Sequence, residues 1–169
     1  DLVRQQWVTK NQVGWNPRLD IEHARGSHSI GGSFYGFESD HWGQVVWGEH
    51  LTGSLDQRQR YYRYKGKKYV ASLYGQEIYD LSPKLSTQVT AQVRYQSYKF
   101  NQDKIGAFKG YNYDLDWLFF SPRIGVTYKL SDKASVFGNI AASSRTPTDA
   151  DIYDANDPYA FPSLKVQKT

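Results

Sequence analysis

The stretch Leu-Ser-Thr-Gln-Val-Thr-Ala-Gln-Val-Arg-Tyr-Gln, residues 85–96, alternates between two kinds of side chain. Successive side chains of a β-strand point to opposite faces, so a period of two predicts a strand with one apolar face and one strongly polar face. The same pattern is clear over 13–22 and 120–128 and weaker over 27–38, 68–80 and 134–144. No segment carries a convincing helical period, and the sequence therefore predicts an all-β protein.

The connections between the predicted strands alternate strictly between short and long. The strands are expected at about 11–23, 27–38, 68–80, 85–98, 117–130 and 134–144. Tight turns rich in Gly, Pro, Ser and Asp fall at 24–26, 81–84 and 131–133, whereas the long connections are 39–67, 99–116 and the tail 145–169. Short turns at one end and long loops at the other are typical of an antiparallel up-and-down transmembrane β-barrel.

Composition excludes several other classes of protein. The 169 residues include no Cys, which excludes disulfide scaffolds and Cys-ligated metals, and the net charge of +4 is too small to indicate nucleic-acid binding. No window approaches the ~18 apolar residues of a membrane-spanning helix. A barrel stays possible because its alternating strands give ordinary hydropathy. The 14 Tyr, 5 Trp and 8 Phe favour β structure or a membrane interface.

Two other folds are compatible with the alternation. A soluble β-sandwich that binds a glycan or an anion would place its apolar faces inward, but its strands are typically nearer five or six residues. A complete small outer-membrane barrel of about eight strands, an adhesin or structural protein, would need two more strands hidden in 39–67 or 145–169. The long strands and the loop asymmetry favour part of a larger barrel.

Several motifs occur in an order that is found in one family. They are Phe120-Ser121-Pro122-Arg123-Ile124-Gly125-Val126-Thr127-Tyr128, then Val136-Phe137-Gly138-Asn139, then Ser144-Arg145-Thr146-Pro147. This order resembles the barrel of TonB-dependent outer-membrane receptors. Residues 11–19 and Asp40-His41-Trp42-Gly43 resemble the type found in Bacteroidetes.

The resemblance implies a fold, a location and a function. A complete receptor of this family has a plug domain, a TonB box and about twenty-two strands, a barrel size that suits a plugged lumen. We therefore expect an internal fragment, without the plug, of a receptor in the outer membrane of a Gram-negative bacterium. The resemblance implies TonB-energised uptake of a scarce solute, with siderophore-iron, cobalamin and oligosaccharide all open. The implied partners are the rest of the barrel, the plug, the TonB complex, outer-membrane lipid and lipopolysaccharide, and the solute.

Three groups of residues are candidate sites. Basic and aromatic side chains interleave in one stretch and could contact an anionic solute or lipopolysaccharide phosphates. These are Arg58, Arg60, Tyr61, Tyr62, Arg63, Tyr64 and Lys65. Polar residues of the strands are expected to face the lumen or the plug, namely Arg18, Asp20, Glu22, Gln88, Gln92, Arg94 and Arg123.

The third group is acidic. Asp149, Asp151, Asp154 and Asp157 offer oxygen ligands suited to Ca²⁺, although their spacing is not that of an EF-hand loop. The alternative is an ordinary acidic extracellular loop. No other cofactor is expected. None of the four His has zinc-ligand spacing, and no nucleophile or phosphate-binding motif occurs, so we predict that the protein is not an enzyme.

Overall fold

A computed structural model describes residues 1–49, 59–105, 110–147 and 167–168. Nine β-strands are assigned within these ranges, and no helix there is long and apolar enough to cross a membrane. The strands are β1 (Leu2–Trp15), β2 (Arg18–His23), β3 (Gly26–Gly48), β4 (Arg60–Ser82), β5 (Leu85–Gln102), β6 (Asn112–Ser131), β7 (Ala134–Ala141), β8 (Ser144–Arg145) and β9 (Gln167–Lys168).

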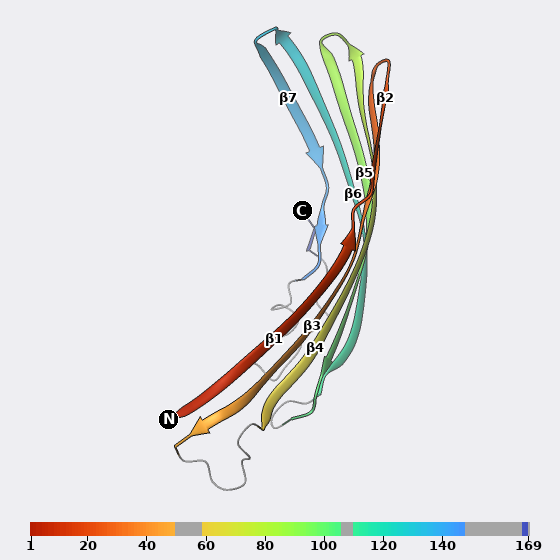
Figure 1. The fold of residues 1–169 in the computed structure, drawn as a ribbon. Coiled ribbons are helices and arrows are strands. Elements are labelled where there is room, and N and C mark those ends of the chain that lie inside the picture. Colours follow the sequence, from red (N-terminus) through yellow and green to blue (C-terminus); the bar gives the residue numbers. More distant parts are fainter. Residues whose placement is uncertain (50–58, 106–109, 148–166, 169) are drawn as a thin grey trace.

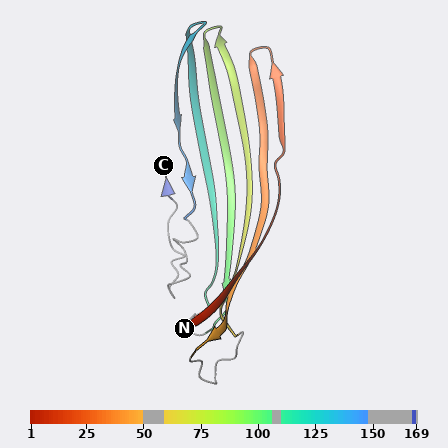
Figure 2. The same cartoon turned by 60° about the vertical axis from the view of Figure 1, so that its left-hand side comes forward.

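One long antiparallel sheet makes up nearly all of the described chain. Its strand order is β1-β3-β4-β5-β6-β7, with β2 continuing the line of β1 beside β3. Figures 1 and 2 show that the sheet curls like a section of a cylinder wall, and that β8 lies on its concave side. The predicted all-β, antiparallel up-and-down arrangement is confirmed. A sandwich of two packed sheets is not seen in the described residues, nor is a closed ring, since β1 and β7 are not paired.

All three short turns lie at one end of the sheet, which we call the turn end (Figure 1). They fall at residues 24–25, 83–84 and 132–133. The opposite end, where β3 leads toward β4 and β5 toward β6, is called the loop end. This arrangement matches the alternation of short and long connections read from the sequence.

The strands run further toward the loop end than the sequence predicts. Residues 39–48 and 60–67, expected in a loop, extend β3 and β4, and parts of 99–116 extend β5 and β6. Apart from Trp42, the outward side chains of 39–44 and 60–67 are mostly polar or charged, so the apolar signal used to place the strands is weak there. The first predicted strand also begins earlier, at Leu2, and breaks at Asn16–Pro17.

Two prolines lie beside the point where the pairing of two strands begins or ends. The Pro17 carbonyl accepts a 2.9 Å hydrogen bond from Gly32 N, and the Pro122 carbonyl accepts a 3.0 Å bond from Ala142 N. Proline has no N–H to donate, so it is tolerated where pairing begins or ends. Pro17 separates β1 from β2, and Ala142 directly follows the end of β7.

The convex face carries an apolar band. On β5 the outward positions from Leu85 to Tyr95 are those of the alternating stretch, and residues 85–95 have about the length of a tilted membrane-spanning strand. Neighbouring outward side chains are apolar and open to the surroundings, with Leu73 60%, Phe120 60% and Ile124 57% exposed. A surface of this kind is stable against lipid and costly in water.

Candidate functional site

The concave face of the band is polar, and it collects the strand residues expected to face the lumen. Register pairs Asp20 with Ser29, Ser29 with Gln76, and Gln76 with Thr90, which in turn faces Arg123. Because directly paired residues share a face, this row crosses the concave side. Because alternate residues of a strand share a face, the concave side also carries Arg18, Glu22, Gln88, Gln92 and Arg94.

Local hydrogen bonds hold much of this polar face. Arg18 Nε donates to Asp20 Oδ2 at 2.8 Å, and Ser29 Oγ donates to Asp20 Oδ1. Gln88 Nε2 donates to Gln76 Oε1 at 2.9 Å. These hydrogen bonds, within one strand and between neighbouring strands, stabilise the polar concave face of the sheet. Glu22 is exposed, so its side chain remains open to the concave space.

The two arginines that sequence reasoning singled out have different surroundings. Arg94 donates through one guanidinium nitrogen to the Ser144 carbonyl at 3.4 Å, and its guanidinium carbon lies 4.9 Å from the centroid of the buried Phe119 ring. Arg94 therefore fastens the segment after β7 to the concave face. Arg123 is exposed, and is the cation of this pair that is more open to solvent.

The basic and the aromatic side chains of the interleaved stretch lie on opposite faces of one strand. It forms the start of β4 rather than a loop, so its alternate residues face opposite sides. Tyr62 and Tyr64 face the concave side opposite Gly43 and His41, whereas Arg63 faces the convex side opposite Trp42.

Contacts of the remaining members agree with this division. Tyr61 accepts a 3.1 Å hydrogen bond from the concave-facing Gln6. Arg60 lies 4.7 Å from the centroid of the Trp42 ring on the convex side, and Lys65 shares that side. Arg58 lies outside the described residues. Among the described residues of this stretch, the tyrosines and the cations therefore occupy opposite faces, and its contact with an anionic solute or with lipopolysaccharide stays a prediction.

An aromatic cluster fills the concave face toward the loop end. Phe100 and Tyr98 are its buried centre, 2% and 6% exposed. The Phe100 ring stacks on Tyr113 with centroids 4.8 Å apart and on Tyr64 at 5.4 Å. Around this centre, the half-buried members are Tyr64, Tyr111, Tyr113, Leu115 and Trp117. Sequence reasoning named only Tyr64 among the candidate sites. Most of the other members fall in the range 99–116, which was expected to be a long loop, and Tyr98 and Trp117 fall at the ends of predicted strands.

A charged belt crosses the convex face just beyond the apolar band. Lys67 Nζ lies 2.8 Å from Glu38 Oε1, Lys99 Nζ lies 2.7 Å from Asp114 Oδ2, and Arg63 pairs with Asp40 at 2.8 Å. The hydrogen bond that Lys67 donates to Glu38 raises the pKa of Lys67, and the one that Lys99 donates to Asp114 raises the pKa of Lys99.

The belt marks where the sheet leaves the apolar band. Because charges on a lipid-facing surface are costly inside the hydrocarbon, the belt sets the boundary at the row of Tyr69, Ser97 and Asp116. The aromatic cluster lies at the same level on the other face.

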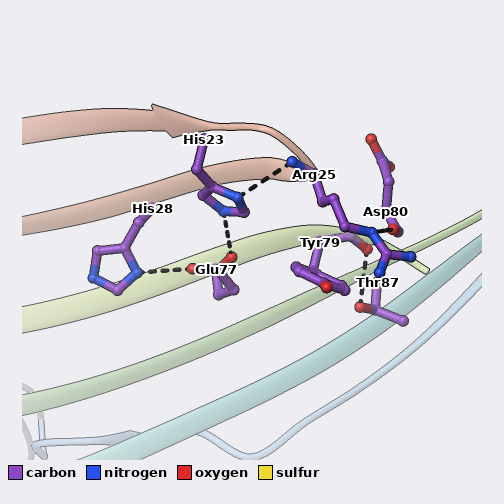
Figure 3. A network of polar contacts seen from close by, with 7 residues as sticks. All are labelled: His23, Arg25, His28, Glu77, Tyr79, Asp80 and Thr87. Carbon is purple, nitrogen blue, oxygen red and sulfur yellow. Dashed lines mark hydrogen bonds and ion pairs between the residues drawn. The ribbon is translucent and has the colours of Figure 1, made fainter.

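Two histidines meet one carboxylate on the convex face near the turn end (Figure 3). His23 Nε2 lies 2.9 Å from Glu77 Oε1, and His28 Nδ1 lies 2.8 Å from Glu77 Oε2. Arg25 sits over the Tyr79 ring at 4.9 Å and donates to the carbonyl of Asp80. Linear spacing gave no signal for this network, because β-pairing brings its three strands together.

The acidic candidates Asp149, Asp151, Asp154 and Asp157 lie outside the described residues, so the calcium prediction stays a prediction. In the part of the chain that the structure describes, no group of three His, Asp or Glu side chains is arranged to hold a metal ion.

A curled antiparallel sheet with an apolar convex band, a polar concave face and all its short turns at one end defines part of an outer-membrane β-barrel wall. The family model of TonB dependent receptor-like β-barrels matches residues 2–169. The chain belongs to this family, which comprises outer-membrane transporters of Gram-negative bacteria rather than enzymes. No match was found among curated proteins.

Proposed function

We propose that the aromatic cluster lines a path for a ring-containing solute taken up by TonB-energised transport. The proposal rests on the cluster around Phe100, which lies on the concave face beyond the apolar band. With short turns on the periplasmic side and long loops outside, as is general in such barrels, this is the extracellular half of the lumen. A solute arriving from outside meets these rings first.

An oligosaccharide is the solute class that suits this face best. Tyrosine rings provide flat apolar surfaces together with hydroxyl groups, as at Tyr64 and Tyr113. Amides lie nearby on the same face at Gln96 and Gln102. A neutral, hydroxyl-rich solute with ring faces complements such a surface, which carries few charges relative to the convex belt.

A ferric siderophore is the second candidate, and cobalamin uptake is a further class within the same transport mechanism. One contact favours the siderophore: Lys68 Nζ lies 4.9 Å from the centroid of the Tyr98 ring on the concave face. A cation beside aromatic rings suits an anionic chelate with aromatic groups.

The remaining partners follow from the family and are proposals for this chain. Other strands of the same barrel pair with β1 and β7, a plug domain contacts the polar concave row containing Asp20 and Arg123, and the TonB complex supplies energy through the plug. The strand edges support the first of these, because unpaired backbone groups are not tolerated in hydrocarbon. The motifs at 11–19 and 40–43 support a receptor of the Bacteroidetes type.

The experiment uses a strain whose receptor gene is deleted and then restored with variants. Tyr64→Ala removes a ring that stacks on Phe100, and we expect uptake to fall about fivefold, since one ring stack contributes on the order of 1 kcal/mol. Growth is measured on a panel of glycans as sole carbon source, and separately with ferric chelates under iron limitation.

Tyr69→Ala is the matched control. Tyr69 is on the same strand but faces outward and is 51% exposed. It should leave uptake near the wild-type level, with equal receptor amounts in the outer membrane. Uptake that survives Tyr64→Ala, or that falls equally in both variants, would contradict the proposed role of the cluster.

A further inference from the structure

A tyrosine ring lies flat on the concave face, on the side of the aromatic cluster that is nearer the turn end. A Cβ atom on Gly31 would lie 2.6 Å from Cε1 and Oη of Tyr74, so the phenol end of this ring occupies the space above the glycine. The ring therefore rests on β3 with one face, and its other face is turned toward the concave space. In the cluster, by contrast, Tyr64 and Phe100 stack on each other and cover one another's faces.

Neutral hydrogen-bonding groups continue the surface beside this ring. Register places Gln92 directly opposite Tyr74, and Ser121 directly opposite Gln92. All three side chains are half-buried. An amide and two hydroxyl groups in one row can both donate and accept hydrogen bonds. A ring face beside such groups suits a sugar unit, which has an apolar face and a rim of hydroxyl groups.

A cation borders this row on the side of the loop end. Arg94 is the diagonal neighbour of both Tyr74 and Ser121, a position about 7–8 Å away. Its guanidinium donates to the Ser144 carbonyl and lies against the Phe119 ring, and these contacts hold the group in place without neutralising its charge. Because a guanidinium has five N–H donors, others remain for an anion.

The concave face around Arg94 carries an excess of positive charge. In the described strands β3 to β6, the one carboxylate at a concave position is Asp80, near the turn end. Asp20 and Glu22 on β2 are three strand spacings from Arg94, about 14 Å, and Asp20 is already ion-paired. Arg123 adds an exposed cation on β6. The charged belt of the convex face differs, because carboxylates neutralise three of its cations.

We propose that Tyr74, Gln92, Arg94 and Ser121 bind an acidic sugar unit of the transported oligosaccharide, one that carries a carboxylate or sulfate group. Tyr74 stacks on the sugar ring, Gln92 and Ser121 bond to its hydroxyl groups, and Arg94 bonds to the acid group. Neutral units of the same chain suit the aromatic cluster. This site rests on the proposed transport of an oligosaccharide, to which it adds a requirement for an acid group.

The test uses the intact receptor, purified in detergent and titrated with a panel of uronic-acid and sulfated oligosaccharides. Each is paired with its own neutral form, made by carboxyl reduction or by desulfation, so that the panel separates a carboxylate ligand from a sulfate ligand. At least one acidic member should bind about tenfold more tightly than its neutral form, since hydrogen bonds to charged groups are the stronger ones.

The variants separate the contribution of charge from that of the ring. Arg94→Gln should weaken binding of this acidic member about tenfold and leave its neutral form within about twofold. Arg94→Lys keeps the charge and should recover most of the affinity for the acidic form. Tyr74→Ala should weaken both forms alike, about fivefold, because the ring contacts the sugar whatever its charge.

Arg60→Gln is the matched control, because Arg60 also lies over an aromatic ring, that of Trp42, but faces outward. It should change the binding of either form less than about twofold. Heat-modifiable migration checks that each variant is folded. If Arg94→Gln does not fold, Arg123→Gln, at an exposed position, should weaken acidic binding about threefold.

Equal affinity for every acidic member and its neutral form would overturn the acidic-sugar site. An equal loss of both forms in Arg94→Gln would also overturn it and assign Arg94 a structural role. If uptake falls in Tyr64→Ala while charge makes no difference to binding, the proposed solute path stands and this site does not. Binding of neither form to the wild-type receptor would contradict oligosaccharide transport itself.

Discussion

The three side chains joined at Glu77 illustrate how one residue can hold a lipid-facing surface together. A carboxylate in the apolar band is costly by itself, and its two histidine contacts offset that cost. Glu77→Ala removes the common partner and leaves both imidazoles against lipid. We expect it to lower the free energy of unfolding of the receptor.

This change is measured as the guanidinium midpoint of the receptor folded in lipid vesicles. Glu22→Ala, on the concave face of the neighbouring hairpin, is the control and should shift the midpoint little. Equal shifts for both variants would show that the convex network has no special contribution.

Asp40 makes stability in the charged belt depend on pH. The hydrogen bond from Arg63 lowers the pKa of Asp40 below its ordinary value, although partial burial acts against this. A lowered pKa in the folded state stabilises the fold above the unfolded-state pKa, near 4, and this contribution is lost as pH falls through the folded value.

Asp40→Asn should therefore be less stable than wild type at pH 7, by about 0.5–1 kcal/mol. The difference should vanish below the lowered pKa, where the wild-type carboxyl is also neutral. Unfolding is followed at several pH values from 7 to 3, and a constant difference across this range would contradict the ion-pair explanation.

The β2–β3 hairpin depends on a single glycine. Gly26 has φ +151°, and a Cβ atom at that position would collide with the Ile78 carbonyl oxygen of β4. Gly26→Ala should therefore lower the yield of folded receptor severalfold, since both backbone strain and a backbone contact oppose it. Gly75→Ala on β4 is the control, because its Cβ would meet no atom within 4 Å. The fraction of heat-modifiable receptor on a gel measures the outcome.

Sequence patterning was sufficient to predict the strands where one face meets lipid, and insufficient where neither face does. Alternation at 85–95 predicted both the strand and its facing correctly, because lipid requires outward apolar residues there. Beyond the apolar band, toward the loop end, the outward residues Lys67 and Lys99 are charged and the concave residues are aromatic. There the outward face is the polar one and the concave face the apolar one, the reverse of the pattern within the band. For the same reason the cluster around Phe100 was not recognised from the sequence.

The orientation of the whole sheet can be tested in intact cells. The 169 residues contain no cysteine, so a thiol introduced here is the only one in this part of the receptor, and the receptor without it serves as the background control. Asn112→Cys, at the loop end, should react with a membrane-impermeant maleimide added to cells, whereas Asp132→Cys, in a short turn, should react only after the outer membrane is disrupted. The reverse pattern would invert the barrel and remove the basis for the proposed solute path.

The first residues of β4 have a consequence for how such a receptor can change over time. Tyr62 and Tyr64 face the concave side while Arg63 and Lys65 face outward. Adjacent residues therefore contact different surroundings, and selection acts on each of them for different reasons. If the proposed solute path is correct, substitutions at Tyr62 and Tyr64 alter solute preference while Arg63 and Lys65 are selected for their outward surroundings. A deletion of one residue would exchange the two sets at once. Variation in this segment should therefore proceed by substitution, or by insertions and deletions in pairs.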